Sequence, residues 1–165
     1  ARSDSVEKDY FVKKVLLEDV VHTAIMNYMD SLIQKKISLD VYNLENYVYI
    51  DEKWITFIIC QVLQNSIKYL NKPEKIIKIH SENNKNNVVL VIEDNGEGIL
   101  DHDLPRVFEY GFTGTDRQKQ YSTGIGLYLC KKLCNKMNLD IKIESQYKKF
   151  TKVKIIFPKT NLYRQ

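Results

Sequence analysis

Three short groups of residues carry side chains and glycines that suit ligand binding. The first is a polar ridge of Gln61, Asn65, Lys68 and Tyr69, which would lie along one face of a helix. The neighbouring positions are apolar, so a helix here would be largely buried and its polar ridge would need hydrogen-bond partners. Those partners could be other parts of the protein or a bound ligand, and the ridge alone favours neither.

The second group is Asp94-Asn-Gly96-Glu-Gly98-Ile99, which follows an apolar stretch expected to be a strand. A carboxylate at a strand end accepts hydrogen bonds in a fixed direction. Glycines directly after it let a flat ligand approach the backbone closely. A plain Asp-Asn-Gly turn would not explain why two glycines and Ile99 come together before a long loop.

The third group is Ser122-Thr-Gly124-Ile-Gly126-Leu127, at the expected start of a helix. Free backbone N–H groups and the helix dipole make such a position a natural phosphate cradle. No strand directly precedes it, so it is not a dinucleotide-binding fingerprint, and no Gly-Lys-Ser/Thr marks a P-loop. A single Gly-x-Gly is weak evidence, whereas three such groups in this order are specific.

Hydrophobic periodicity predicts the elements that position these groups. Two helices are expected before the long loop, one capped by Asp19 and reaching Leu32, and one capped by Asp51 and reaching about Leu70. A third should follow Gly126 and end near Asn138. Strands are expected at 11–17, 37–41, 47–50, 75–81, 88–93, 140–145 and 152–157.

Helices and strands in this order predict an α+β fold, with a mixed sheet of about five strands covered on one face by three helices. The segment 94–123 is rich in glycine and charge, with one short helical patch near 104–109. A loop this long inside a compact domain is usually functional, and we expect it to be a lid.

The composition limits the classes of protein to which this chain can belong. The chain has 165 residues, 44% of them apolar, which suits one domain with a proper core. Its net charge of +4 comes from scattered basic residues, and no nucleic-acid-binding motif accompanies them. Three cysteines in no framework spacing indicate a reducing compartment, and Cys130 and Cys134 are expected to be small buried hydrophobes. The longest apolar stretch, within 54–63, is too short to span a membrane.

The three groups together resemble the motifs of the GHKL (Bergerat-fold) ATP-binding superfamily. Asn65 with Lys68 and Tyr69 resembles its N-box, 94–99 its G1 box and 124–127 its G2 box. The stretch 106–113 looks like the F-box of histidine kinases. The resemblance covers nearly all of residues 10–158, and it implies a catalytic and ATP-binding domain there. Residues 1–9 are expected to be a flexible segment or a cloning remnant, and 159–165 a tail.

The resemblance implies ATP and Mg²⁺ as cofactors and gives individual residues their roles. Asn65 would ligate Mg²⁺, which needs few protein ligands when phosphates and waters supply the rest. Lys68 would lie near the phosphates as the second catalytic residue, Tyr69 would pack near the purine, and Asp94 would accept from the adenine amino group. The other residues expected to bind ATP are Gly96, Gly98, Ile99, Phe108, Gly111, Phe112, Thr113, Thr123, Gly124, Ile125, Gly126 and Leu127.

Gln61 indicates the branch of the superfamily. The gyrase-like ATPases and the serine kinases have a glutamate four residues before the N-box asparagine, and a glutamine cannot serve as a general base at neutral pH. A histidine kinase needs no such base, because imidazole is itself a nucleophile. Histidine kinases commonly have asparagine at this position and often a basic residue near Gly114, which is absent here; Arg117 or Lys119 could replace it.

The resemblance extends to the intramembrane-sensing kinases that respond to bacitracin and similar peptides. It implies a cytoplasmic domain of a membrane-anchored, homodimeric parent, with a dimerisation domain and a response regulator as partners. None of His22, His80 and His102 has the sequence context of a phosphoacceptor, so that histidine is expected in another domain. The alternatives are a GHKL ATPase or serine kinase, and a degenerate module that only contacts a regulator.

Overall fold

The computed structural model describes residues 10–114 and 124–159 of the chain. In chain order its helices and strands are β1 (Val12–Leu16), α2 (Leu17–Asn27), α3 (Met29–Gln34), β2 (Ser38–Tyr42), β3 (Tyr47–Asp51), α4 (Glu52–Lys68), β4 (Ile76–Asn83), β5 (Asn87–Asp94), the 3₁₀ helix η1 (Leu104–Arg106), α5 (Gly126–Lys136), β6 (Asp140–Gln146) and β7 (Phe150–Pro158).

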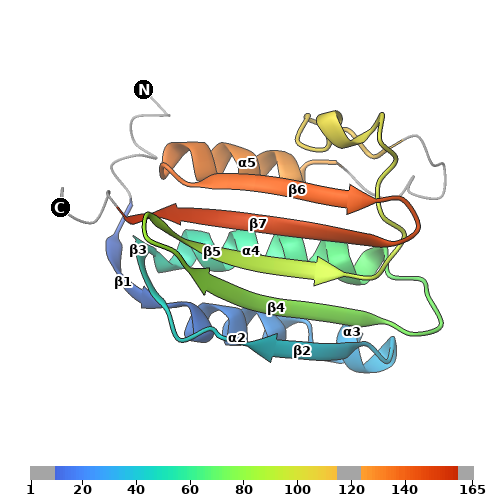
Figure 1. Ribbon diagram of the computed structural model, residues 1–165, viewed down its shortest axis with the longest axis horizontal. Helices are drawn as coiled ribbons and strands as arrows, with labels where there is room; N and C mark the ends of the chain where they lie inside the picture. Colours follow the sequence, from blue (N-terminus) through green and yellow to red (C-terminus); the bar gives the residue numbers. More distant parts are fainter. Residues whose placement is uncertain (1–9, 115–123, 160–165) are drawn as a thin grey trace.

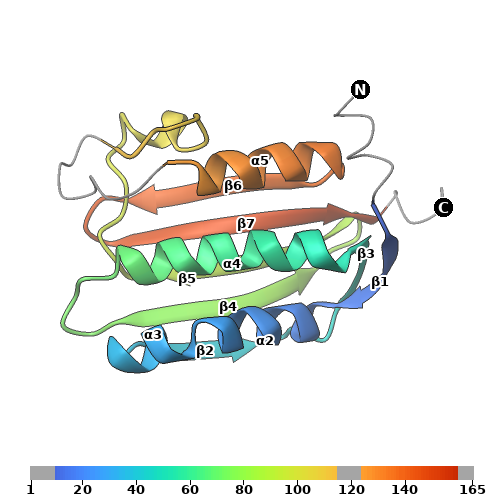
Figure 2. The ribbon, with the colours of Figure 1, turned by 180° about the vertical axis from the view of Figure 1, so that it is seen from behind.

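A five-stranded sheet with the order β2-β4-β5-β7-β6 forms one layer of the fold. Only the β2–β4 pair is parallel, which makes the sheet mixed. Figures 1 and 2 show that α2, α3, α4 and α5 all lie on one face of this sheet, behind it in Figure 1 and in front of it in Figure 2. The remaining strands, β1 and β3, form a separate antiparallel ribbon. The predicted α+β sandwich with a mixed sheet of about five strands is therefore confirmed.

Alternation along the strands decides which side chains enter the core. Helix α4 lies centrally on the sheet, and its Ile55, Ile58, Ile59 and Leu63 are fully buried. On the opposite face, where residues 10–114 and 124–159 form no helix, one row across all five strands alternates in charge. This row runs Asp40, Lys78, Glu93, Lys152, Glu144 from β2 to β6. Opposite charges directly across strands favour this register.

The start of helix α4 is capped as the sequence predicts. Asp51 accepts hydrogen bonds at Oδ1 from the backbone N–H groups of Lys53 (3.0 Å) and Trp54 (3.3 Å). Its Oδ2 accepts from the N–H of Phe11 at 2.8 Å, which ties the ribbon to the helix. The carboxylate is 4% exposed, so three hydrogen bonds satisfy a group that burial would otherwise destabilise.

The expected first helix, capped by Asp19 and continuous to Leu32, is wrong at its start and its middle. Helix α2 begins at Leu17 without a side-chain cap. The N–H groups of Leu17 and Glu18 bond instead to carbonyls of the loop before β3, at 3.0 and 3.1 Å. Those tertiary partners replace a cap, so the strand expected to include Leu17 ends at Leu16.

The same helix is interrupted at Tyr28, which has φ −116° and ψ 15° and separates α2 from α3. Asn27, next to it, is a poor helix former, and its amide lies 3.5 Å from the Cys60 sulfur of α4. The periodic apolar positions continue through the break, and periodicity alone therefore did not reveal it.

The remaining elements lie close to their predicted places. The helical patch expected near 104–109 is reduced to the 3₁₀ turn η1. Helix α5 ends at Lys136, and Asn138 follows with φ 59°, a left-handed position that asparagine tolerates. Cys60, Cys130 and Cys134 are all buried and free, as expected of small hydrophobes. Among the described residues no helix is both long and apolar enough to cross a membrane.

Asp51→Ala should destabilise the domain by about 2 kcal/mol, since it removes the cap and the tie to β1. Asp19→Ala is the matched control, because its carboxylate caps nothing, and it should change the free energy of unfolding by less than about 0.5 kcal/mol. Urea denaturation followed by circular dichroism measures both. Equal losses in the two variants would contradict the capping assignment.

Candidate functional site

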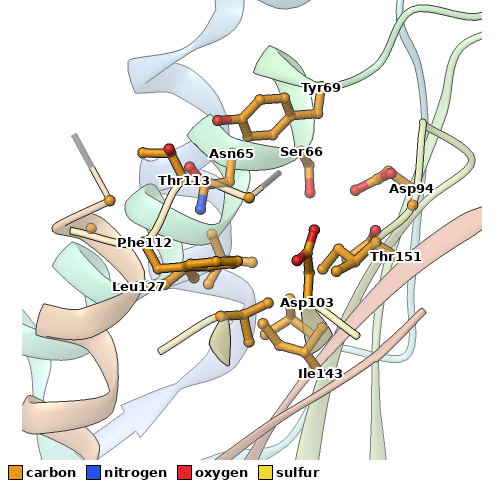
Figure 3. Close-up of a pocket in the computed structure, with 18 residues that line it drawn as sticks. Asn65, Ser66, Tyr69, Asp94, Asp103, Phe112, Thr113, Leu127, Ile143 and Thr151 are labelled. Atoms are coloured by element: carbon orange, nitrogen blue, oxygen red, sulfur yellow. The ribbon is translucent and has the colours of Figure 1, made fainter. Parts of the chain in front are cut away.

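One cavity opens between α4, the loop after β5, the start of α5 and the strands β6 and β7, as Figure 3 shows. Asn65, Ser66 and Tyr69 enter it from α4, and Asp94 from the end of β5. Its complete lining is Val62, Asn65, Ser66, Tyr69, Asp94, Gly98, Ile99, Asp103, Val107, Phe112, Thr113, Gly114, Gly124, Gly126, Leu127, Ile143, Thr151 and Val153.

The cavity brings together residues of all three sequence groups and of the F-box, which lie up to 62 positions apart in the chain. Ten of the residues expected to bind ATP line it: Asn65, Tyr69, Asp94, Gly98, Ile99, Phe112, Thr113, Gly124, Gly126 and Leu127. Five others lie beside it without lining it: Lys68, Gly96, Phe108, Gly111 and Ile125. Thr123 lies outside the described residues, as do Arg117 and Lys119.

Asp94 is one of two buried carboxylates that line the cavity. Its side chain is 6% exposed, and burial raises its pKa to about 6. The N–H of Gly96 donates to its Oδ1 at 2.9 Å, and the Ser66 hydroxyl also donates to it; both bonds favour the ionised form and partly offset burial. A carboxylate held in this way can accept a further hydrogen bond from a ligand in the cavity.

Gly98 holds the loop after β5 against the hairpin that joins β6 to β7. Its φ is +73°, and a Cβ built on it would lie 2.2 Å from the carbonyl oxygen of Gln146. Beside it, the N–H of Ile99 donates to Ser145 Oγ at 2.8 Å, and the N–H of Lys148 donates to the carbonyl of Glu97. Only glycine permits both the backbone angle and the close approach.

Gly111, within the expected lid, and Gly124, directly after it, meet in a similar contact. The N–H of Gly111 donates to the carbonyl of Gly124 at 3.1 Å. Gly124 has φ +69°, and a Cβ there would lie 2.6 Å from the carbonyl oxygen of Phe112. The ring of Phe112 lines the cavity, and the guanidinium of Arg106 lies 4.4 Å from its centroid. This stacking fixes one cavity wall.

The polar ridge of α4 serves three different purposes. Asn65 and Tyr69 line the cavity. Gln61 packs against the start of α5, where a Cβ built on Gly126 would lie 2.6 Å from its Oε1. Lys68 points to solvent with its ammonium 5.7 Å from the centre of the Tyr69 ring. Of the two expected catalytic residues, the structure therefore brings only Asn65 into the cavity.

Sequence analysis missed eight residues of the lining: Val62, Ser66, Asp103, Val107, Gly114, Ile143, Thr151 and Val153. One had a signal that could have been used, since Ser66 follows Asn65 on the helix. Thr151 had none, because only the β5–β7 register places it directly opposite Asp94. Asp103 had none, because in sequence it is one acidic residue of a charged loop.

The donors in the cavity fit Mg²⁺ held together with phosphates rather than by the protein alone. No group of three or more His, Cys, Asp or Glu side chains that could hold a metal ion occurs among residues 10–114 and 124–159. Asn65 offers one amide oxygen at the cavity wall. That suffices for a cation that normally keeps waters and substrate oxygens as its other ligands.

The sequence profile of the family "Histidine kinase-, DNA gyrase B-, and HSP90-like ATPase" matches residues 50–161, about two thirds of the chain. The chain belongs to this family. ATP is therefore the nucleotide expected of the cavity, whose lining combines the family's asparagine, aspartate and glycine motifs.

Among curated relatives, the chain is 38% identical over 157 residues to the sensor protein BceS of Halalkalibacterium halodurans, covering 94% of this chain and 46% of that protein. It is 36% identical over 162 residues to the sensor protein kinase GraS of Staphylococcus aureus strain MRSA252, covering 97% and 46%. The chain thus spans about half the length of these relatives. Its fold is similar to that of the mycobacterial sensor histidine kinase MprB, with a TM-score of 0.76 at 20% identity, over 90% of this chain and 97% of that one.

Asp94→Asn should stabilise the nucleotide-free domain at pH 7.5 by up to about 3 kcal/mol, the free energy that corresponds to raising a carboxyl pKa from 3.8 to about 6. Because the folded pKa lies above the unfolded one, this cost of ionisation is absent below pH 4, grows as the pH rises to 6, and is constant above. The gain should therefore nearly vanish at pH 4. Urea denaturation at both pH values measures it, and a gain that is the same at both would contradict the burial argument.

Gly98→Ala should destabilise the domain by more than about 2 kcal/mol and weaken nucleotide binding, since its methyl group would collide with the Gln146 backbone. Gly111→Ala is the matched control, because Gly111 has a similar φ of +76° but nothing within 4 Å of a Cβ. It should cost only the backbone strain, about 1 kcal/mol. Thermal unfolding and ADP titration compare the variants, and equal effects would show that crowding at Gly98 is unimportant.

Proposed function

We propose that this domain binds Mg-ATP and donates the γ-phosphoryl group to a histidine on a separate dimerisation domain of a two-component sensor kinase, from which the phosphate passes to a response regulator. The observation that carries the proposal is the placement of Gln61. Its side chain packs on Gly126. Gln61 lies one helical turn before Asn65, at the position where ATP-hydrolysing relatives have a carboxylate. The nucleophile must then bring its own reactivity, as an imidazole does.

The cavity supplies positioning rather than covalent chemistry. Asp94 would orient the base, with Ile99 and Tyr69 beside it. Asn65 would hold Mg²⁺, which supplies positive charge to the phosphates when bound. The N-terminal end of α5, at Gly126, presents free N–H groups to the same region. Lys68, at the exposed end of the ridge, would reach the phosphates from outside the cavity.

The similarity to BceS and GraS supports the sensor-kinase assignment and a role in the response to antibiotic peptides that act on the cell envelope. We infer that the parent protein is a membrane-anchored homodimer with this domain in the cytoplasm. His22 and His102 are exposed and His80 is half-buried on β4. None lies in the sequence context of a phosphoacceptor, so we assign that role to the dimerisation domain, and a response regulator would be the partner that receives the phosphate.

Calorimetric titration tests the nucleotide part of the proposal. ATP and ADP should bind with Mg²⁺, and Asp94→Asn should abolish binding. The asparagine oxygen would keep the hydrogen bond from the Gly96 N–H, so its NH2 group, a donor, would face the amino group of the base. In Asn65→Ala the contribution of Mg²⁺ to the affinity should disappear. Gln64→Ala is the matched control, because Gln64 precedes Asn65 on the same helix, is exposed and does not line the cavity, and it should bind like the unaltered chain. Absence of nucleotide binding under all conditions would favour a module that only contacts a regulator.

The transfer step needs a second assay. The domain, mixed with γ-labelled ATP and the separately purified dimerisation hairpin of a BceS-type kinase, should label that hairpin in an acid-labile manner, as expected of phosphohistidine. The variant Gln61→Glu tests the alternative of a GHKL ATPase or serine kinase. Rapid ATP hydrolysis by the unaltered chain, without a histidine acceptor, would contradict the proposal; hydrolysis gained only by Gln61→Glu would support it.

A further inference from the structure

Asp103 is a second buried carboxylate in the nucleotide cavity. The residue is 4% exposed, and it lines the cavity with Asp94. In Figure 3 its carboxylate points into the space between Ser66 and Thr151, while the ring of Phe112 lies on its other side. The apolar side chain of Ile143, from β6, lies below it in this view and lines the same cavity.

Asp103 lies at the N-cap position of η1 without capping it through its side chain. Asp103 directly precedes the Leu-Pro-Arg turn η1, where an aspartate normally caps the helix, yet its side chain makes no capping hydrogen bond. Nε2 of His102 lies 3.4 Å from Oδ1 of Asp103, and the His102 side chain is itself 67% exposed. A carboxylate turned away from the helix start and into a cavity is placed to meet a ligand.

We propose that Asp103 is a base-selecting residue, which accepts a hydrogen bond from the exocyclic amino group of adenine alongside Asp94. This rests on the proposed function, since it assigns the base preference of the same site. The amino group of adenine has two N–H donors, and the cavity offers one carboxylate from β5 and one from the loop before η1. Each carboxylate can accept one of them.

The same arrangement would exclude guanine. Guanine carries a carbonyl oxygen where adenine has its amino group, and two carboxylates facing that oxygen would repel it. Rejecting a base through repulsion and lost hydrogen bonds is more effective than rejecting it by shape alone. Asp103 would thus weaken the binding of guanine nucleotides further, in addition to the effect of Asp94.

The test compares ADP and GDP binding by calorimetry in the unaltered chain, in Asp103→Asn and in Asp101→Asn. In Asp103→Asn the amide can donate to the guanine carbonyl, so the ratio of ADP to GDP affinity should fall by about tenfold or more. Asp101 is exposed in the same loop, two residues away, and Asp101→Asn should leave the ratio unchanged. Circular dichroism establishes that each variant is folded.

A measurement on the unaltered chain decides the case if Asp103→Asn does not fold. N6-methyl-ADP has one N–H in place of two, so only one of the two carboxylates can receive a hydrogen bond, and it should bind about tenfold more weakly than ADP. Equal affinity for the two, or an unchanged ADP to GDP ratio in a folded Asp103→Asn, would overturn the role of Asp103 while the proposed function stands. Absence of ADP binding by the unaltered chain would contradict the proposed function itself.

Discussion

The cavity depends on a backbone contact that only glycine allows. At Gly98 the loop after β5 lies directly against the backbone of Gln146, which holds the loop and the β6–β7 hairpin together. Ser145 strengthens the contact, because its hydroxyl accepts from Ile99 and donates to the carbonyl of Phe150 at 2.7 Å. The cavity wall that includes Ile99 is therefore fixed to β6 and β7, the strands that also line the cavity. A looser loop would leave Asp94 exposed to water and remove the desolvation that raises its pKa.

The cavity has two chemically different ends. At one end lie hydrogen-bond acceptors and hydroxyls, namely Asp94, Ser66 and Thr151. Asn65 and Thr113 lie together on the other side, near the glycines that begin α5. No Lys or Arg side chain is among the described residues that line the cavity. A ligand with a donor-rich base and an anionic tail matches this division, provided that N–H groups and a metal ion meet the anionic charge.

Much of the fold follows from local patterns, and the errors occur where tertiary contacts decide. The apolar periodicity of α4 and the aspartate before it predicted that helix almost to the residue, because cap and core face act locally. Helix α2 begins at Leu17 because carbonyls of a loop that includes Asn46 satisfy its first N–H groups, and no local pattern reports a partner 29 residues away. In the site, Thr151 was hidden for the same reason, since only the strand register brings it opposite Asp94.

On the polar ridge of α4, Gln61 has a packing role, whereas Asn65 lines the cavity. Gln61 lies against Gly126, where any larger residue than glycine would have to displace its amide. It therefore fixes the distance between α4 and the start of α5, the two elements that bring Asn65 and the Gly124–Gly126 motif into one cavity. A carboxylate at this position would bring a negative charge close to the anionic part of the ligand, which would be tolerated only if that charge took part in activating a nucleophile. A neutral amide avoids this repulsion, and under the proposed function it would leave the activation of the nucleophile to the group that meets the nucleotide from another domain.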